Sequence, residues 1–217
     1  MPNPPGDRVL VTGALGQIGT DLVEALREAH GTDAVIATDI REIEGHPSVE
    51  SGPFMLLDVL DNDRMIEICR EEEIGSIYHL AALLSAIGER DPDRCRTVNV
   101  GGTVSVLEAA KECSLRVYTP SSIAVFGPDA PKSTPQDAVL NPTTVYGETK
   151  VTGELLANEY MENFGVDTRG IRYPGLISYK APAGGGTTDY AVEIFQAALE
   201  NGHYECFVRP DTRLPML

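Results

Sequence analysis

The sequence has no long hydrophobic run, little positive charge and no paired cysteines, and each absence excludes a class of protein. No apolar stretch approaches the roughly 18 residues that a membrane-spanning helix needs. The start, Met-Pro-Asn-Pro-Pro-Gly-Asp, has neither the basic nor the apolar segment of a secretory signal. We therefore expect a cytoplasmic globular protein with no membrane partner.

Positive charge is scarce, because 17 Lys and Arg stand against 33 Asp and Glu and leave a net charge of -16. A surface of this sign repels nucleic acid and anionic membranes, so neither is expected as a partner. Two explanations of the excess stay open. One is a solvated acidic exterior, and the other is adaptation to a salty cytoplasm in which self-repulsion is screened.

The four cysteines form no C-x-x-C pair, and the four histidines are not clustered with them. A structural zinc site needs such a cluster. We therefore expect free thiols and no metal.

A strand, a glycine-rich turn and a helix open the chain. Residues 8–12 are mostly apolar, and a helical stretch to about His30 follows the turn. Gly13 permits a tight turn, Gly16 lets backbone approach a pyrophosphate, and Gly19 lets the helix pack on the strand. The helix N-terminus offers N–H groups to phosphates. This pattern predicts a dinucleotide site that uses Gly13, Gly16, Gln17, Ile18 and Gly19.

A second strand, residues 34–38, ends at Asp39, 20 residues beyond Gly19. A carboxylate there can accept both ribose hydroxyls of the adenosine and would repel a 2'-phosphate, which favours NAD over NADP. Arg41 lies two residues further on, so NADP stays open as the cofactor. Ile40 is also expected to contact the cofactor at this end of the site. A third strand, residues 53–57, runs into Asp58 and Val59. Adenine contact and a plain turn are equally open for Asp58.

Further strands are predicted over residues 76–80, 115–119 and 166–173. They alternate with helices predicted over residues 61–73, 93–113 and about 146–164, and a last helix follows Thr188 and ends at about residue 201. Strands and helices alternating at this spacing predict an α/β fold, a Rossmann-type doubly wound parallel sheet with helices on both faces. Two glycines, Gly101 and Gly102, inside one helix imply close packing. His79 is expected to be a packed residue at a strand end.

Tyr146 and Lys150 are four residues apart on a predicted helix, so both side chains can point into one site. A neighbouring ammonium favours the phenolate form of tyrosine. A lysine together with a cationic cofactor ring could bring the tyrosine pKa from about 10 to about 7. The pair predicts an acid/base site.

Five motifs occur in order: Thr12-Gly-x-x-Gly-x-x-Gly19, His79-Leu-Ala-Ala82, Asn99-Val-Gly-Gly-Thr103, Pro120-Ser-Ser122 and Tyr146-x-x-x-Lys150. With them the chain resembles the extended short-chain dehydrogenase/reductase family. The resemblance implies that Ser122 hydrogen-bonds the reacting oxygen, with Ser121 able to share this role, that Tyr146 is the acid/base, and that Lys150 holds the nicotinamide ribose. It also implies a homodimer, and further NAD contacts at Leu80, Ala81, Ala82, Asn99, Tyr173 and Pro174.

The stretch from Tyr173 to Tyr190 resembles the epimerase-like L-threonine 3-dehydrogenase class of this family. That resemblance implies NAD-dependent oxidation of L-threonine, with the oxo-acid product passed to 2-amino-3-oxobutyrate CoA ligase. Backbone N–H groups of Gly184-Gly-Gly186 could hold a carboxylate. The expected substrate contacts are Ser85, Ser121, Ser122, Tyr146, Gly186 and Thr187. A flexible loop with a helix cap is the structural alternative for this stretch.

The resemblance divides the chain into an NAD-binding domain, residues 1–175, which includes the catalytic helix, and part of a substrate-binding lobe, residues 176–217. The family continues beyond this point. Two other functions stay open: a nucleotide-sugar 4-epimerase or dehydratase on the same scaffold, and a regulator that binds NAD without turning it over.

Overall fold

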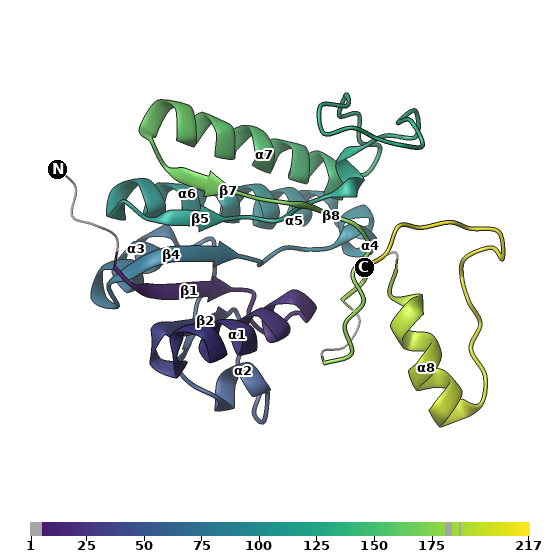
Figure 1. The fold of residues 1–217 in the computed structure, drawn as a ribbon, viewed down its shortest axis with the longest axis horizontal. Coiled ribbons are helices and arrows are strands. Elements are labelled where there is room, and N and C mark those ends of the chain that lie inside the picture. The colour runs from purple at the N-terminus through teal and green to yellow at the C-terminus, as the bar shows by residue number, and fades with distance from the viewer. Residues whose placement is uncertain (1–5, 181–183, 187) are drawn as a thin grey trace.

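The centre of the molecule is a six-stranded parallel sheet (Figure 1). The computed structural model describes residues 6–180, 184–186 and 188–217. The strand order is β3-β2-β1-β4-β5-β7, and the strands are β1 (Arg8–Thr12), β2 (Val35–Asp39), β3 (Phe54–Leu56), β4 (Ile74–His79), β5 (Arg116–Tyr118) and β7 (Asp167–Arg169). The order reverses between β1 and β4, and ligands of such sheets bind at that switch point. The predicted α/β fold class is confirmed.

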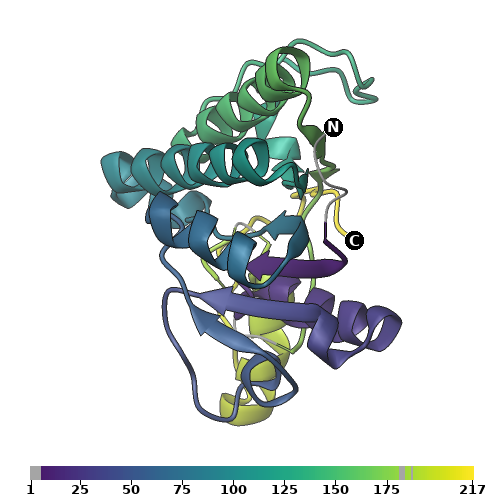
Figure 2. The ribbon, with the colours of Figure 1, turned by 90° about the vertical axis from the view of Figure 1, so that its left-hand side faces the viewer.

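Both faces of the sheet are buried, because alternate residues of a strand point to opposite sides. On β1, Val9 and Val11 pack towards Val23 and Leu26 of α1 (Gln17–His30), whereas Leu10 packs into the core on the other face. Figure 2 shows α1 on one side of the sheet and, on the other, α3 (Asn62–Glu71), α6 (Gly102–Cys113) and α7 (Val145–Phe164). None of the helices in the described ranges is long and apolar enough to cross a membrane.

Local capping explains where two of the predicted helices begin. The Asp61 carboxylate accepts from Arg64 N at 3.0 Å and starts α3, and the Thr144 hydroxyl accepts from Gly147 N at 3.0 Å and starts α7. Two short helices were not predicted, α2 (Pro47–Glu50) and α4 (Ser85–Arg90). Both are too short for a hydrophobic period to reveal them.

The helix predicted over residues 93–113 is three pieces, α5 (Pro92–Arg96), a π-helical turn (Thr97–Gly101) and α6. A π turn adds a residue to the helical repeat and is frequent at functional sites. Close packing at the two glycines is confirmed. A Cβ on Gly102 would lie 2.8 Å from Val59 Cγ2, and one on Gly101 would lie 3.0 Å from Leu60 Cδ2.

The strand predicted over residues 166–173 is also wrong in its second half. Only β7 joins the main sheet, while β8 (Arg172–Tyr173) pairs with β6 (Ser121–Ser122) in a separate two-stranded sheet. The break falls at Gly170, where a Cβ would come within 2.4 Å of Thr119 O. The chain leaves the sheet there and carries β8 towards the carboxyl end of β5.

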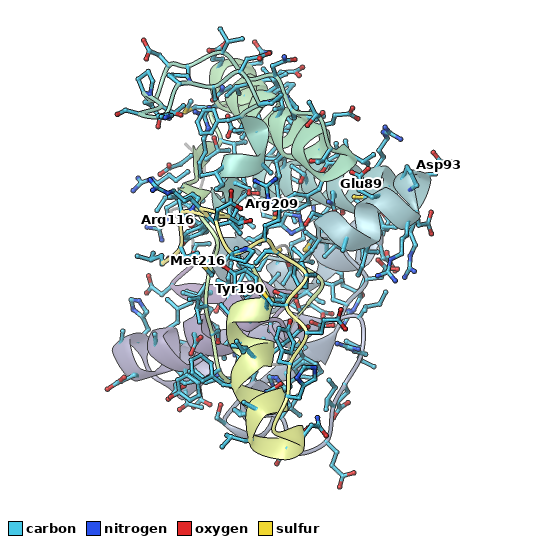
Figure 3. The ribbon with its side chains drawn as sticks, turned by 90° about the vertical axis from the view of Figure 1, so that its right-hand side faces the viewer. Glu89, Asp93, Arg116, Tyr190, Arg209 and Met216 are labelled. Carbon is cyan, nitrogen blue, oxygen red and sulfur yellow. The ribbon has the colours of Figure 1, made fainter. Side chains whose placement is uncertain are left out.

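The last part of the chain lies beyond the carboxyl ends of the strands and includes α8 (Tyr190–Asn201) (Figure 1). Its end returns to Gly175, whose N–H donates to Pro215 O at 3.0 Å and whose carbonyl accepts from Leu217 N at 2.8 Å. Figure 3 shows Tyr190, at the start of α8, beside Met216, and the Tyr190 hydroxyl lies 3.8 Å from its sulfur. The domain boundary at residue 175 stays a prediction.

Candidate active site

Two glycines of the turn after β1, Gly13 and Gly19, are packed so tightly that no side chain fits. Gly13 has φ +67°, and a Cβ there would lie 2.6 Å from Ala81 N. A Cβ on Gly19 would lie 2.3 Å from Gly13 O, so α1 sits directly on the turn. Gly16 is the N-cap of α1 and has no side chain to fill the cap. Among the described residues no side chain caps the first turn of α1, so its N–H groups can hold phosphate oxygens, as the spacing predicts.

Asp39 lies at the end of β2, beside this turn, as expected. Its Oδ2 accepts from Leu15 N at 3.2 Å, which holds the carboxylate across the turn. Ile40 and Arg41 follow it and are exposed. Within the described chain, Gln17 Nε2 is buried without a hydrogen-bond partner, so it is available to a ligand. These features fit the adenosine and pyrophosphate of NAD.

The structure gives Asp58 and Val59 local roles. Asp58 is exposed, and its Oδ1 accepts from Leu60 N at 3.0 Å, which is the behaviour of a turn residue. Val59 is buried and packs against Gly102. Contact of either residue with adenine stays a prediction.

His79 is a packed residue at the end of β4, as expected. Its Nδ1 lies 2.9 Å from the Thr12 hydroxyl, and Leu80 N donates to Thr12 O at 3.1 Å. Burial, reinforced by the Lys150 ammonium, lowers the pKa of His79 to about 3, so the ring is neutral at ordinary pH. These bonds hold residues 80–82 in place at the switch point.

A cavity of about 490 Å³ opens from the switch point and runs beneath α7. The expected cofactor contacts Ala81, Ala82, Asn99 and Lys150 line one part of it. The other part is lined by side chains that the motifs did not point to, including Thr149, Gly153, Glu154, Asn158 and Arg172.

Asn99 ties the site together from inside the π turn. Its amide accepts from Leu83 N at 2.8 Å and donates to Leu83 O at 3.0 Å, so it mimics a strand partner for that segment. The same Nδ2 lies 3.1 Å from the Thr149 hydroxyl on α7. Asn99 thus joins the segment after β4 to the helix that carries Tyr146 and Lys150.

Tyr146 and Lys150 share one face of α7, and Lys150 Nζ lies 5.6 Å from the centroid of the Tyr146 ring. Lys150 also donates to Pro120 O at 2.9 Å, and burial lowers its pKa to about 8. Burial raises the pKa of Tyr146 to about 12, against the lowering effect of a hydrogen bond with Ser122. The predicted pKa near 7 therefore depends on further positive charge, which a cationic cofactor ring would bring.

The two serines of β6 point to different places. The Ser122 hydroxyl accepts from Ala124 N at 3.2 Å, and it acts to lower the pKa of Tyr146. Ser121 is buried and donates to Glu154 Oε1 at 2.5 Å. Ser121 is therefore engaged by Glu154, and the roles of both serines in the reaction stay predictions.

The expected substrate residues approach one another at α4. Ser85 is its first residue, and the next N–H, on Ala86, donates to Gly185 O at 3.2 Å. The N–H groups of Gly185 and Gly186 both donate to Asp189 Oδ2 at 2.7 Å. A substrate carboxylate at Gly186 would have to replace that partner. Thr187 lies outside the described residues.

Tyr173 is the last residue of β8 and Pro174 follows it, and their contact with NAD stays a prediction. The Tyr118 hydroxyl donates to the Tyr173 hydroxyl at 2.7 Å, which fixes the ring at the end of β8. The sequence motifs missed the residues behind α7, but helical spacing could have found one of them. Glu154 is four residues after Lys150 and therefore on the same face.

A model of the NAD dependent epimerase/dehydratase family matches residues 9–209. The chain belongs to this family. An uncharacterized epimerase/dehydratase of Staphylococcus aureus strain USA300 is 52% identical over 211 residues, which are 97% of this chain and 66% of that protein. The chain therefore spans slightly less than two thirds of the curated relatives it matches.

Several similar solved structures are L-threonine dehydrogenases. The enzyme of Clostridium difficile has a TM-score of 0.92 at 49% identity, over 98% of this chain and 67% of that one. The holo form of a GalE-like enzyme from Cupriavidus necator has a TM-score of 0.91 at 44% identity, over 97% and 68%. UDP-glucose 4-epimerase of Brucella ovis with NAD is less similar, with a TM-score of 0.72 at 27% identity over 78% and 52%.

Proposed function

We propose that the protein oxidises L-threonine at its β-carbon with NAD and forms L-2-amino-3-oxobutyrate. The observation that carries the proposal is the grouping of Ser122, Tyr146 and Lys150 beside α4 in a chain similar to L-threonine dehydrogenases. Val145 N donates to Glu89 Oε1 at 2.8 Å, and this bond docks α4, with Ser85, against the start of α7.

The three side chains divide the proton chemistry between them. Tyr146, as phenolate, takes the proton of the substrate hydroxyl, and Ser122 donates a hydrogen bond to the same oxygen. The Lys150 ammonium favours the ionised phenol by its positive charge. When bound, NAD supplies the acceptor for the hydride that leaves the β-carbon.

One assay separates this reaction from its alternatives. NADH absorbance is followed with L-threonine. UDP-glucose is incubated in parallel and its products are separated by chromatography, because an epimerase or dehydratase returns the hydride to its substrate and leaves no net NADH. NADH appearing with threonine alone supports the proposal. Conversion of UDP-glucose supports a sugar-nucleotide enzyme, and NAD binding without turnover of either compound supports a regulator.

Replacement of the acid/base is the direct test of the site. We expect Tyr146→Phe to lower kcat by about 10²- to 10⁴-fold, the usual contribution of a positioned proton acceptor. NAD affinity, followed by fluorescence, should change little because the phenyl ring remains. A Tyr146→Phe protein with wild-type turnover of threonine would refute the assignment.

The partners belong to the proposal as well. We expect a homodimer formed by the helices that contain Asn99 and Tyr146, which light scattering would detect as twice the mass of one chain. The β-oxo-acid product is unstable, so we also expect it to pass to 2-amino-3-oxobutyrate CoA ligase.

A further inference from the structure

The carboxylate of Glu154 joins three elements that meet behind the active site. Both of its oxygens accept from Arg172 on β8, Oε1 from Nε at 2.8 Å and Oε2 from Nη2 at 2.7 Å. Oε1 also accepts from the Ser121 hydroxyl on β6 at 2.5 Å. Glu154 lies on α7, one turn beyond Lys150, so a single side chain links the catalytic helix to both strands of the small sheet.

Ser121 and Ser122 are successive residues of a strand, and their side chains therefore point to opposite faces. Ser121 donates to Glu154, while Ser122 lies on the side of Tyr146 and acts to lower the pKa of its phenol. β6 has only two residues and one neighbouring strand, and its backbone is held by the bonds from Ser121 N to Ile171 O at 2.8 Å and from Lys150 to Pro120 O at 2.9 Å. A bond that fixes Ser121 against α7 also fixes how far the Ser122 hydroxyl lies from the Tyr146 phenol.

Arg172 extends the same network. Its Nη1 donates to Gln136 O at 2.9 Å, in the long loop between β6 and α7. Its guanidinium carbon also lies 5.2 Å from the centroid of the Phe126 ring. The ion pair between Arg172 and Glu154 therefore connects β8, the loop before α7 and α7 itself.

The pair is built differently from the surface ion pairs of this chain. The side chains of Arg172 and Glu154 are 16% and 24% exposed, whereas those of Arg96 and Glu148, another pair involving α7, are 48% and 52% exposed. Burial acts to raise the pKa of Glu154, but hydrogen bonds from Arg172 and Ser121 outweigh it and leave the pKa below its ordinary value. Glu154 is therefore ionised at neutral pH. A bidentate, partly desolvated pair holds its geometry more firmly than an exposed one.

We propose that Glu154 is a positioning residue: by holding Ser121 and Arg172 against α7, it sets the Ser122 hydroxyl at its place beside Tyr146. This role rests on the proposed function of the Ser122, Tyr146 and Lys150 site. Glu154 itself has no contact with the reacting atoms.

The test compares Glu154→Gln and Ser121→Ala with Glu148→Gln, which disrupts an exposed ion pair on the same helix. We expect kcat with threonine to fall about tenfold in the first two variants, since misplacing one hydrogen bond costs about one factor of ten in rate. The KM for NAD should not change. The pH at which kcat reaches half its maximum should rise, because the bond from Ser122 lowers the pKa of Tyr146. Glu148→Gln should match the wild type in all three.

The double variant Glu154→Gln/Ser121→Ala tests whether both residues act through the same serine. We expect it to be no slower than the slower single variant, because contacting residues in one network are not additive. Full additivity would overturn the proposal. So would two single variants of unchanged kcat and pH profile that had lost only stability in urea, because a merely structural ion pair behaves in that way.

A second readout does not need turnover. Carbon-13 NMR of tyrosine-labelled protein in complex with NAD follows the ionisation of Tyr146, with the signal assigned by its loss in Tyr146→Phe. We expect the Tyr146 midpoint to rise in Glu154→Gln and to stay at the wild-type value in Glu148→Gln, and an unmoved midpoint in Glu154→Gln overturns the positioning role. If the wild type fails to oxidise threonine, the proposed substrate fails while this titration still decides the role of Glu154.

Discussion

The Asp39 carboxylate is the single residue on which the choice of dinucleotide depends. It is held across the glycine turn by Leu15 N, where the 2'-position of an adenosine ribose is expected. We expect Asp39→Ser to weaken NAD binding about tenfold, because an acceptor for the ribose hydroxyls is lost. The ratio of NAD affinity to NADP affinity should also fall, because the charge that repels the 2'-phosphate is lost. Fluorescence titration with both cofactors measures this, with the exposed Asp63→Asn as control. Wild-type protein that binds NADP as tightly as NAD would contradict the role of Asp39.

His79 makes stability depend on pH. Its pKa is lowered from the usual 6.5 to about 3 by burial, so between these values the unfolded chain binds more protons than the folded chain. Its contribution to the free energy of unfolding is therefore complete above about pH 7 and is lost as the pH falls towards 3. We expect His79→Asn, which can keep a bond to Thr12, to show a smaller loss between pH 8 and pH 5 in urea unfolding. The exposed His30→Asn should keep the wild-type loss, and an unchanged loss in His79→Asn would exclude this linkage.

Helix α7 contains two glycines, of which one is crowded by neighbouring atoms and the other is not. Replacing each by alanine tests the packing of this single element. A Cβ on Gly147 would lie 2.4 Å from Ala124 O, whereas one on Gly153 would meet nothing within 4 Å. We expect Gly153→Ala to raise the free energy of unfolding by about 0.5–1 kcal/mol through helix propensity. Gly147→Ala should lower it, because backbone atoms cannot move aside. Urea unfolding of both variants measures these changes in the free energy of unfolding. A lower free energy of unfolding in Gly153→Ala would contradict the open space around this position.

At the scale of the whole molecule, the excess of acidic residues governs how the chain responds to salt. With a net charge of -16, self-repulsion opposes the compact state, and added salt screens it. We expect the midpoint of thermal unfolding to rise through a series of NaCl concentrations up to about the molar range, where the screening length is about 3 Å. A midpoint that did not move would exclude adaptation to a salty cytoplasm and leave a plain solvated exterior.

The sheet and the cofactor turn could be predicted because their signals are local. Apolar runs set the strands, and the spacing from Gly13 through Gly19 to Asp39 already describes a βαβ unit. The π turn at Asn99 and the break in the last strand could not be predicted in this way. Both come from contacts between segments far apart in sequence, such as Asn99 with Leu83 and Gly170 with Thr119.

The sequence by itself determined the fold class, the order of the motifs and the chemistry available at Ser122, Tyr146 and Lys150. Only the tertiary structure decided which serine faces the phenol and which faces Glu154. Alternation along a strand puts the two side chains on opposite faces, but it does not determine which elements pack against each face. It also decided that Tyr146 lies where burial opposes ionisation, and that Asp189 holds the N–H groups of the glycine loop. The physical reason is the same in each case: burial and hydrogen-bond partners are properties of packed segments, and the residues that supply them are remote in the chain.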